Sequence, residues 1–346
     1  MFYSSSLKLK KQGLCKVCAR LMKGSSGIIN SNKFKRGDIM ENYIIETKGL
    51  TKKYGDKTSV SNLNLHVRRH SIYGLLGRNG AGKTTTMKML LGLLEPTSGD
   101  IKIFGKQFKG TEKRVLSRIG CLVESPGFYP NLTGTENLEI FAELRGLPRK
   151  KAIKESLELV SLPYKDKKLF SQYSLGMKQR LAIALAIMHD PEILILDEPI
   201  NGLDPIGIAE VREFIKRLCT VKGKTILISS HILSEISLLA DDIGIIDDGE
   251  LIEEMSISEL EKKNEKYIHF LVSNVKHAAE LFSTEFHTDK FKVSDDHNIF
   301  LYDLSLPTAK INRSFVSNGV DIYEMHLCED TLEDYFKKVT GGEGIG

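Results

Sequence analysis

The sequence predicts an α/β fold with an antiparallel flank, followed by a small α+β module. Three observations support this. From Ser71 onward, buried strands alternate with helical patterns, which is the order of a parallel sheet. A glycine-rich segment, Gly77–Thr85, joins a buried strand to a helix, and a later buried strand ends in two carboxylates at Asp197 and Glu198. After about Lys263 the order becomes β-α-β-β-α-β, which is typical of a ferredoxin-like module.

Hydrophobic periodicity and turn residues predict the elements of the first part. Two strands, Tyr43–Thr47 and Leu63–Val67, lie either side of a turn at Tyr54-Gly55-Asp56. Buried strands are expected at Ser71–Leu76, Ile119–Val123, Ile193–Leu196 and Thr225–Ser229. Helices are expected at Thr84–Leu94, Thr135–Arg145, Lys150–Val160, Leu181–Met188 and Ala209–Thr220. A hairpin through Asp247-Asp248-Gly249 should then join Ile243–Ile246 to Glu250–Glu254.

The second part is predicted from the same signals and carries no motif with chemistry. Its strands are expected at Tyr267–Val272, Phe291–Val293, Ile299–Leu304 and Val320–Leu327. Its helices are expected at Val275–Phe282 and Thr308–Phe315, with a closing helix at Asp330–Val339. Three domains follow: a basic leader at 1–39, an α/β domain at 40–262 and an α+β accessory module at 263–346.

Charge is unevenly distributed along the chain. Residues 1–39 contain nine Lys/Arg and one acid, so they carry +8, whereas the formal total is only +4. The remaining body is therefore mildly acidic at −4, which argues against nucleic acid as its main partner. No uninterrupted apolar run reaches the roughly 18 residues that span a bilayer, so any membrane role requires a partner.

Three explanations of the leader remain open. It can be a disordered basic tail, a transit peptide, or translated upstream sequence with Met40 as the true start. The transit peptide is disfavoured because Lys outnumbers Arg. The segment Lys35–Met40 can be encoded with a purine-rich run before the start codon, as in bacteria. Cys15-x-x-Cys18 lacks a second pair or a nearby His, so a zinc site is not expected, and five scattered Cys fit a reducing cytoplasm.

The strongest motif is "GRNGAGKTT", which follows a buried strand and opens a helix. Its glycines let successive backbone N–H groups point at phosphate, and the helix start adds its positive dipole end. We expect Lys83 to reach the β- and γ-phosphates and Thr84 to bind Mg²⁺. The predicted nucleotide-binding residues of this loop are Gly77, Arg78, Asn79, Gly80, Ala81, Gly82, Lys83, Thr84 and Thr85.

The strand "ILILDEP" supplies the complementary carboxylates. Asp197 at the strand end is expected to hold Mg²⁺ directly or through water. Glu198, next to it, is expected to act as general base toward the attacking water.

A short polar segment before the apolar helix indicates the family that the chain resembles. "YSLGMKQR" begins at Tyr173, between the two phosphate-site motifs. By itself Ser174 there predicts an ordinary helix N-cap. Together the three motifs resemble those of ABC-type ATPases, whose signature is L-S-G-G-Q. Here the Ser and the second Gly are present, but the first Gly and the Gln are not. The resemblance implies that Ser174 and Gly176 contact the γ-phosphate of ATP held by a second subunit.

Other segments match the same family in order, over roughly Tyr43–Glu254. Tyr54 lies where an aromatic residue stacks on adenine. Asn201-Gly202-Leu203-Asp204 resembles the loop that crosses the dimer interface, and Pro205 then starts a helix. His231 follows the strand "TILISS" and resembles the switch His that contacts the γ-phosphate. The resemblance makes Glu198 and His231 the expected catalytic residues.

Glu124 is a departure, because the family usually has Gln there as a metal ligand. The expected metal ligands are therefore Thr84, Glu124 and Asp197. Glu124 and the segment "YSLGMKQR" together make the chain resemble the ATPases of lantibiotic self-protection and bacitracin export, which work with separate membrane subunits. The alternative is a general ABC-2 type exporter with another substrate.

The resemblance implies an ATP- and Mg²⁺-dependent subunit of an exporter, peripheral at the cytoplasmic face of a bacterial membrane. Its partners would be a polytopic permease, contacted through Pro126–Thr133 with Phe128 and Tyr129, and a second ATPase subunit, either a copy or a close paralogue. A soluble ABC machine in repair or translation is disfavoured because the chain has one ATPase half and no heptad run. The accessory module could instead sense a ligand, although packing on the core or aiding dimerisation is favoured.

Overall fold

The computed structural model describes residues 43–124, 126–263, 266–329 and 332–341. The predicted leader, Met40 and the Cys15/Cys18 pair lie outside these residues. The chain divides into two compact units between Ile257 and Ser258. The predicted limit at 262/263 falls at the end of helix α10 (Ile257–Lys263), and the three-domain division remains a proposal.

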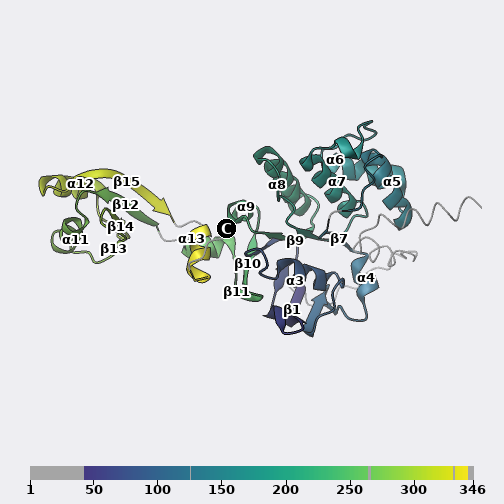
Figure 1. Ribbon diagram of the computed structural model, residues 1–346, viewed down its shortest axis with the longest axis horizontal. Coiled ribbons are helices and arrows are strands. Elements are labelled where there is room, and N and C mark those ends of the chain that lie inside the picture. The colour runs from purple at the N-terminus through teal and green to yellow at the C-terminus, as the bar shows by residue number, and fades with distance from the viewer. Residues whose placement is uncertain (1–42, 125, 264–265, 330–331, 342–346) are drawn as a thin grey trace, which may run out of the picture. The chain divides into compact units, whose positions relative to one another are not determined.

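A six-stranded sheet forms the centre of the first unit (Figure 1). Its order is β11-β10-β4-β9-β8-β7, and β10, β4, β9, β8 and β7 run parallel while β11 pairs antiparallel with β10. The strands are β4 (Ile72–Leu76), β7 (Ile119–Leu122), β8 (Ile193–Asp197), β9 (Thr225–Ser230), β10 (Asp242–Asp247) and β11 (Glu250–Ser256). The carboxyl ends of the parallel strands therefore meet at one edge of the sheet, where ligands of such folds bind.

The antiparallel flank is present, but its strands were partly mispredicted. It comprises β1 (Tyr43–Tyr54), β2 (Lys57–Leu63), β3 (His66–Arg68), β5 (Ser98–Ile103) and β6 (Lys106–Gln107). The prediction of one continuous strand over Leu63–Val67 is wrong. Leu63 is the last residue of β2, and His66 begins the separate strand β3. The half of β1 after Thr47 was missed since its polar residues lack alternation. Backbone pairing with β2 and β5 holds it extended.

Helices cover the sheet and form a separate group. They are α3 (Lys83–Leu90), α4 (Glu112–Leu116), α5 (Gly134–Arg145), α6 (Arg149–Leu159), η1 (Phe170–Gln172), α7 (Leu175–Ile187), α8 (Pro205–Thr220) and α9 (Leu233–Ser237). Figure 1 shows α5, α6 and α7 together, and these three helices contact one another. The capping box of Thr133 and Glu136 begins α5, and Gly146 in the left-handed region ends it.

Two predicted helix limits are corrected. Helix α3 stops at Leu90 rather than Leu94, because Gly92 takes φ +60° and turns the chain. Helix α7 starts at Leu175, six residues before the predicted Leu181. Its first turn is polar and partly exposed, so hydrophobic periodicity did not report it.

The second unit has the predicted ferredoxin-like order. A four-stranded antiparallel sheet, β13-β14-β12-β15, is formed by β12 (Lys266–Val272), β13 (Phe291–Val293), β14 (Asn298–Leu301) and β15 (Ile322–Glu329). Helices α11 (Val275–Thr284) and α12 (Thr308–Ser317) contribute to its apolar core with Phe282 and Phe315. Strand β15 begins two residues later than predicted because Val320 is buried in the preceding loop. Helix α13 (Leu332–Val339) also belongs to this unit.

Within the residues that the structure describes, no helix combines the length and apolarity needed to cross a membrane.

Candidate ATP site

The glycine-rich loop follows β4 and passes directly into α3. Its backbone needs glycine at two places. A Cβ on Gly77 would lie 2.2 Å from the carbonyl oxygen of Ile246, and Gly82 takes φ +106° at the start of α3. Asn79, Gly80 and Thr84 are exposed, whereas Ala81 and Gly82 are buried. The loop therefore leaves its outer backbone and the N-terminus of α3 accessible to an anion, and the phosphate-binding role of each loop residue remains a prediction.

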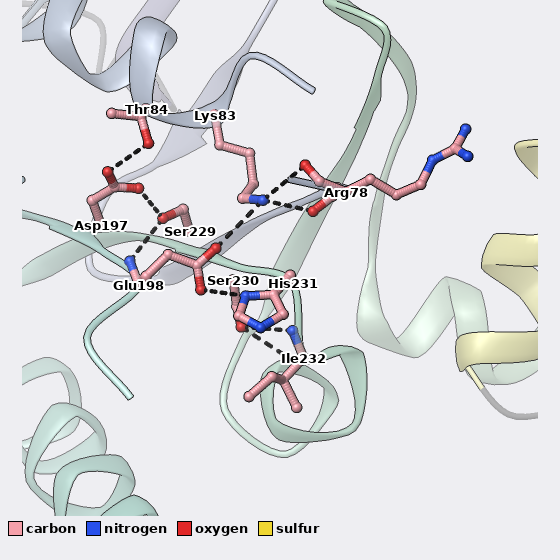
Figure 2. Close-up of polar contacts among 10 residues, drawn as sticks. Arg78, Lys83, Thr84, Asp197, Glu198, Ser229, Ser230, His231 and Ile232 are labelled. Atoms are coloured by element: carbon pink, nitrogen blue, oxygen red, sulfur yellow. Dashed lines mark hydrogen bonds and ion pairs between the residues drawn. The ribbon is translucent and has the colours of Figure 1, made fainter. Parts of the chain in front are cut away.

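Lys83 lies at the centre of the site with its side chain only 5% exposed. Its Nζ donates to the carbonyl oxygens of Gly77 at 2.6 Å and Arg78 at 3.1 Å, and lies 3.4 Å from Glu198 Oε1 (Figure 2). A buried ammonium with these acceptors is oriented toward the loop interior, where phosphate oxygens are expected.

Asp197 and Thr84 are brought together from segments 113 residues apart. Thr84 Oγ1 donates to Asp197 Oδ2 at 2.7 Å, and Ser229 Oγ donates to Asp197 Oδ1 at 2.5 Å (Figure 2). Asp197 and Ser229 are direct neighbours in the β8–β9 register, which explains the second contact. Hydroxyl and carboxylate oxygens are the ligands that Mg²⁺ prefers, so this pair fits the ion.

The residues that the structure describes do not form a complete set of metal ligands from acidic side chains alone. Among the described residues there is no group of three or more His, Cys, Asp or Glu placed to hold a metal. That fits Mg²⁺ bound by one or two protein oxygens together with substrate phosphates, as is usual for this ion.

Glu198 has an unusual backbone conformation. Its φ is +47°, a region that costs a non-glycine residue of order 1–3 kcal/mol and is concentrated at functional sites. Its N–H donates to Ser229 Oγ at 2.9 Å, and the next residue, Pro199, accepts from Gln179 Nε2 at 2.8 Å. These contacts hold the turn, so the carboxylate is fixed beyond the end of β8.

The Glu198 carboxylate points into the site. His231 Nδ1 lies 2.8 Å from Glu198 Oε2, and the two side chains are 22% and 20% exposed. Glu198 Oε1 is buried and has no hydrogen-bond partner among the described residues. Its nearest cation is Lys83 Nζ at 3.4 Å, an ion pair that leaves this oxygen able to accept a hydrogen bond from a water molecule, which is what a general base requires.

Glu124 is not in contact with the Thr84–Asp197 pair. Its Oε1 lies 3.1 Å from Lys88 Nζ, and the two side chains are 44% and 34% exposed. Lys88 is four residues after Thr84 in α3, so the two lie on the same helix face. The structure thus anchors Glu124 one helical turn from the predicted metal ligand, and its own role as a ligand remains a prediction.

The predicted signature segment forms the exposed start of α7. Ser174 is the N-cap, and its Oγ accepts from Met177 N at 3.3 Å. A Cβ placed on Gly176 would meet nothing closer than Leu203 Cδ2 at 4.0 Å, and Leu175 is 55% exposed. The signature segment and the loop Asn201–Asp204 therefore lie beside each other on the surface of one chain.

Two further predicted segments have clear local structure. Tyr54 ends β1 and is 52% exposed, and Lys52 Nζ lies over its ring, 5.2 Å from the centroid. In the loop Pro126–Thr133, Phe128 packs on Phe141 and Phe170 at centroid distances of 5.7 and 5.1 Å. The Phe128 ring therefore shapes the loop, and contact of this loop with a membrane subunit remains a prediction.

Sequence reasoning missed three residues that support the loop. Ser229 braces Asp197, and Ser59 Oγ lies 3.1 Å from Thr85 Oγ1. Asp247 binds Arg78 through two hydrogen bonds, from Nε at 3.1 Å and Nη2 at 2.8 Å. The sequence signals were weak: Ser229 ends a predicted strand, Asp247 begins a predicted turn, and Ser59 belongs to no predicted element.

Known proteins resemble this chain in sequence. The family model described as ABC transporter matches residues 60–201. The bacitracin transport ATP-binding protein BcrA of Enterococcus faecalis is 54% identical over 307 residues, 89% of this chain and 99% of that protein. BcrA of Bacillus licheniformis is 52% identical over 88% of this chain and 99% of its own. The lantibiotic transport ATP-binding protein SrtF of Streptococcus pyogenes is 44% identical over 60% of this chain and 89% of its own.

Solved structures agree on the fold. A dimeric post-hydrolysis state of the ATP-binding cassette MJ0796, bound to ADP and Pi, aligns with a TM-score of 0.55 and 26% identity over 62% of this chain and 98% of that chain. The cbiO1 protein of Clostridium perfringens aligns with a TM-score of 0.58 and 24% identity over 71% of this chain and 97% of its own.

A phosphate loop on a parallel sheet, facing an Asp-Glu pair, defines an ATP-hydrolysing P-loop protein. With relatives of more than 50% identity matched over nearly their whole length, the chain belongs to the ATP-binding subunits of ABC transporters. The predicted fold class, ATP binding and ATPase activity are confirmed.

Proposed function

We propose that this ATPase drives an exporter that protects a bacterial cell against bacitracin-like or lantibiotic-like peptides. The observation that carries the proposal is the 54% identity to a bacitracin transport ATP-binding protein over 99% of that relative. A second support is the 44% identity to a lantibiotic transport ATP-binding protein.

Two copies, or this chain and a close paralogue, would bind two ATP molecules head to tail. Each triphosphate would lie between Lys83 of one subunit and the start of α7 in the other. The exposed N-cap Ser174 and the unobstructed Gly176 support this arrangement, because both leave the helix N-terminus open to an anion. ATP binding then closes the pair and hydrolysis opens it.

The chemical step uses residues that the fold holds in place. Thr84 and Asp197 would hold Mg²⁺, which neutralises charge on the phosphates when bound. Lys83 would stabilise charge on the β- and γ-phosphates. Glu198 would accept a proton from the attacking water at its buried Oε1, which lies 3.4 Å from Lys83 Nζ and accepts no hydrogen bond from the described residues.

His231 would orient Glu198 and contact the γ-phosphate. Its Nδ1 faces Glu198 Oε2 at 2.8 Å, which leaves Nε2 for another partner. Tyr54 would stack on adenine, because its ring is exposed at the end of β1. Both assignments are proposals from position and exposure.

The membrane partner would be a polytopic permease, with the ATPase peripheral at the cytoplasmic face. Its coupling helix would contact the loop Pro126–Thr133, which lies between Glu124 and α5. Residues Phe128 and Tyr129 of this loop are partly exposed, and Tyr129 N donates to Asn137 Oδ1 at 2.7 Å. That bond ties the loop to α5, so force on the loop would reach the helical group.

The proposal is tested in a peptide-sensitive bacterium that expresses this chain with the permease genes found beside its own gene. We expect tolerance to bacitracin or to a lantibiotic to rise, and tolerance to a ribosome-directed antibiotic to stay unchanged. The matched control is the same pair carrying Glu198→Gln. ATPase activity without any rise in peptide tolerance would favour a general exporter with another substrate.

A further inference from the structure

The sheet of the second unit has two very different edges. Edge strand β13 (Phe291–Val293) has three residues and carries Lys292, and both short length and Lys protect a sheet edge against pairing. Edge strand β15 (Ile322–Glu329) has eight residues and contains neither Lys nor Pro. Among the described strands β15 pairs only with β12, so its other side presents free backbone groups.

Apolar side chains on β15 are left uncovered. In the register with β12, Met325 is opposite Phe270 and Leu327 is opposite Ile268, so these pairs share the face that carries the core. Yet Met325 and Leu327 are 37% and 71% exposed, while Phe270 and Ile268 are 0% and 6% exposed. The core covers β12 and reaches Ile322 at the start of β15, but it stops short of Met325 and Leu327.

The sequence of β15 is complementary to itself in the antiparallel direction. With Met325 opposite the partner's Met325, Glu324 lies opposite the partner's His326, and Leu327 lies opposite the partner's Tyr323. The two-fold axis repeats each pair, which gives two carboxylate–imidazole contacts and two apolar contacts. Each favourable cross-strand pair contributes roughly 0.2–1 kcal/mol.

This register also keeps the two faces of the sheet distinct. Glu324 and His326 lie opposite Leu271 and His269 of β12, on the face away from Phe270. A register moved by one residue pair would place His326 opposite the partner's His326 and would lose both carboxylate–imidazole contacts. Within one strand His326 Nε2 already lies 3.3 Å from Glu324 Oε2, and the cross-strand pairs would replace this contact. The pairing of Glu324 with His326 therefore favours the register centred on Met325.

We propose that β15 pairs antiparallel with β15 of a second copy of this chain, centred on Met325, and joins two four-stranded sheets into one. This contact uses main-chain hydrogen bonds and does not involve the ATP site. It therefore holds two copies together whether or not ATP is bound, which distinguishes it from ATP-driven closure of the first units.

The first test is disulfide crosslinking of the full chain without nucleotide. Met325→Cys is introduced into a chain in which Cys15, Cys18 and Cys328 are replaced by Ser. The matched control is Val293→Cys on the opposite edge strand β13, where the residue is 43% exposed. Under mild oxidation we expect a crosslinked dimer from Met325→Cys and none from Val293→Cys or the parent chain.

The second test is a charge exchange measured by sedimentation equilibrium without nucleotide. We expect Glu324→His to weaken dimerisation roughly ten-fold, because two imidazoles then face each other. Adding His326→Glu restores the opposite pairs and should restore the wild-type dissociation constant.

Equal crosslinking of the two edges overturns the proposal, as does a chain that stays monomeric without nucleotide. A Met325→Cys disulfide formed only with another polypeptide also overturns it. Failure of the double exchange to restore dimerisation excludes the register. None of these outcomes bears on peptide export, which is measured separately.

Discussion

His231 Nδ1 lies 2.8 Å from Glu198 Oε2, although the two residues are 33 positions apart in the chain. The contact forms because β8 and β9 are adjacent parallel strands that end at the same edge (Figure 2). It joins the expected general base to the residue expected to report on the γ-phosphate.

Glu198→Gln should lower the steady-state ATPase rate by about 10²–10⁴-fold, because the amide cannot accept the proton of the attacking water. ATP binding should persist, so the variant should accumulate as an ATP-bound dimer. Phosphate release and size-exclusion chromatography with ATP measure the two effects. The matched control is Glu192→Gln at the other end of β8, where the carboxylate pairs with Arg118. A normal rate in Glu198→Gln would contradict the assigned base.

Glu124→Gln should leave ATP affinity within about five-fold of wild type, because exposed ion pairs contribute roughly 0–1 kcal/mol. The pair with Lys88 is of this kind. We expect the change to appear in coupling, as altered peptide tolerance at an unchanged ATP affinity. Glu143→Gln, which breaks a similarly exposed pair with Arg149, is the control. If export and tolerance stay at the wild-type level, Glu124 has no special role.

Gly176→Asp should affect stability and ATP-driven dimerisation in opposite directions. The site has room for a side chain, and an acid in the first turn of α7 stabilises the helix by roughly 0.3–1 kcal/mol. The same carboxylate would repel a partner-bound triphosphate. Thermal unfolding and ATP-dependent dimerisation distinguish the two effects.

A contrasting variant is Gly120→Ala, whose Cβ would lie 2.2 Å from the carbonyl oxygen of Ala186 and should destabilise the fold. If Gly176→Asp still dimerises with ATP like the wild type, α7 does not face a nucleotide.

Asp247→Asn should weaken ATP binding about three- to ten-fold by calorimetry, since charge-assisted hydrogen bonds contribute roughly 1.5 kcal/mol or less when partly exposed. We expect this loss of affinity because Asp247 holds the side chain of Arg78, a residue of the phosphate loop, in place. Asp248→Asn, one residue further along and exposed, removes the same charge without that contact. Equal affinities of the two variants would show that the Arg78 contact is not needed.

Acid should destabilise the chain through His189. Burial of its imidazole, and then the charge of Arg145, lower its pKa from 6.5 to about 3. The unfolded chain therefore binds a proton that the folded chain rejects, and stability falls as pH drops between those values. The slope is up to about 1.4 kcal/mol per pH unit. Urea unfolding at several pH values should show a flatter dependence in His189→Gln, with His277→Gln on the surface as control.

Local signals in the sequence were sufficient for the phosphate loop and the carboxylates, because their chemistry depends on residues adjacent in the chain. Lys83 and Thr84 follow a glycine-rich turn, and Asp197 and Glu198 lie at the end of a hydrophobic strand. The same signals predicted the ferredoxin-like order of the second unit. These signals failed for the second half of β1 and for the start of α7, because polar residues there interrupt the hydrophobic periodicity.

By itself the sequence predicted which residues bind phosphate, since motif spacing and the strand-to-helix order encode that chemistry along the chain. Only the tertiary structure decided which residues support them. Ser229 reaches Asp197 because β9 lies between β4 and β8, and Asp247 reaches Arg78 because β10 lies on the other side of β4. The free edge of β15 was likewise undetectable, because strand order depends on pairings between residues far apart in sequence, which no local pattern specifies.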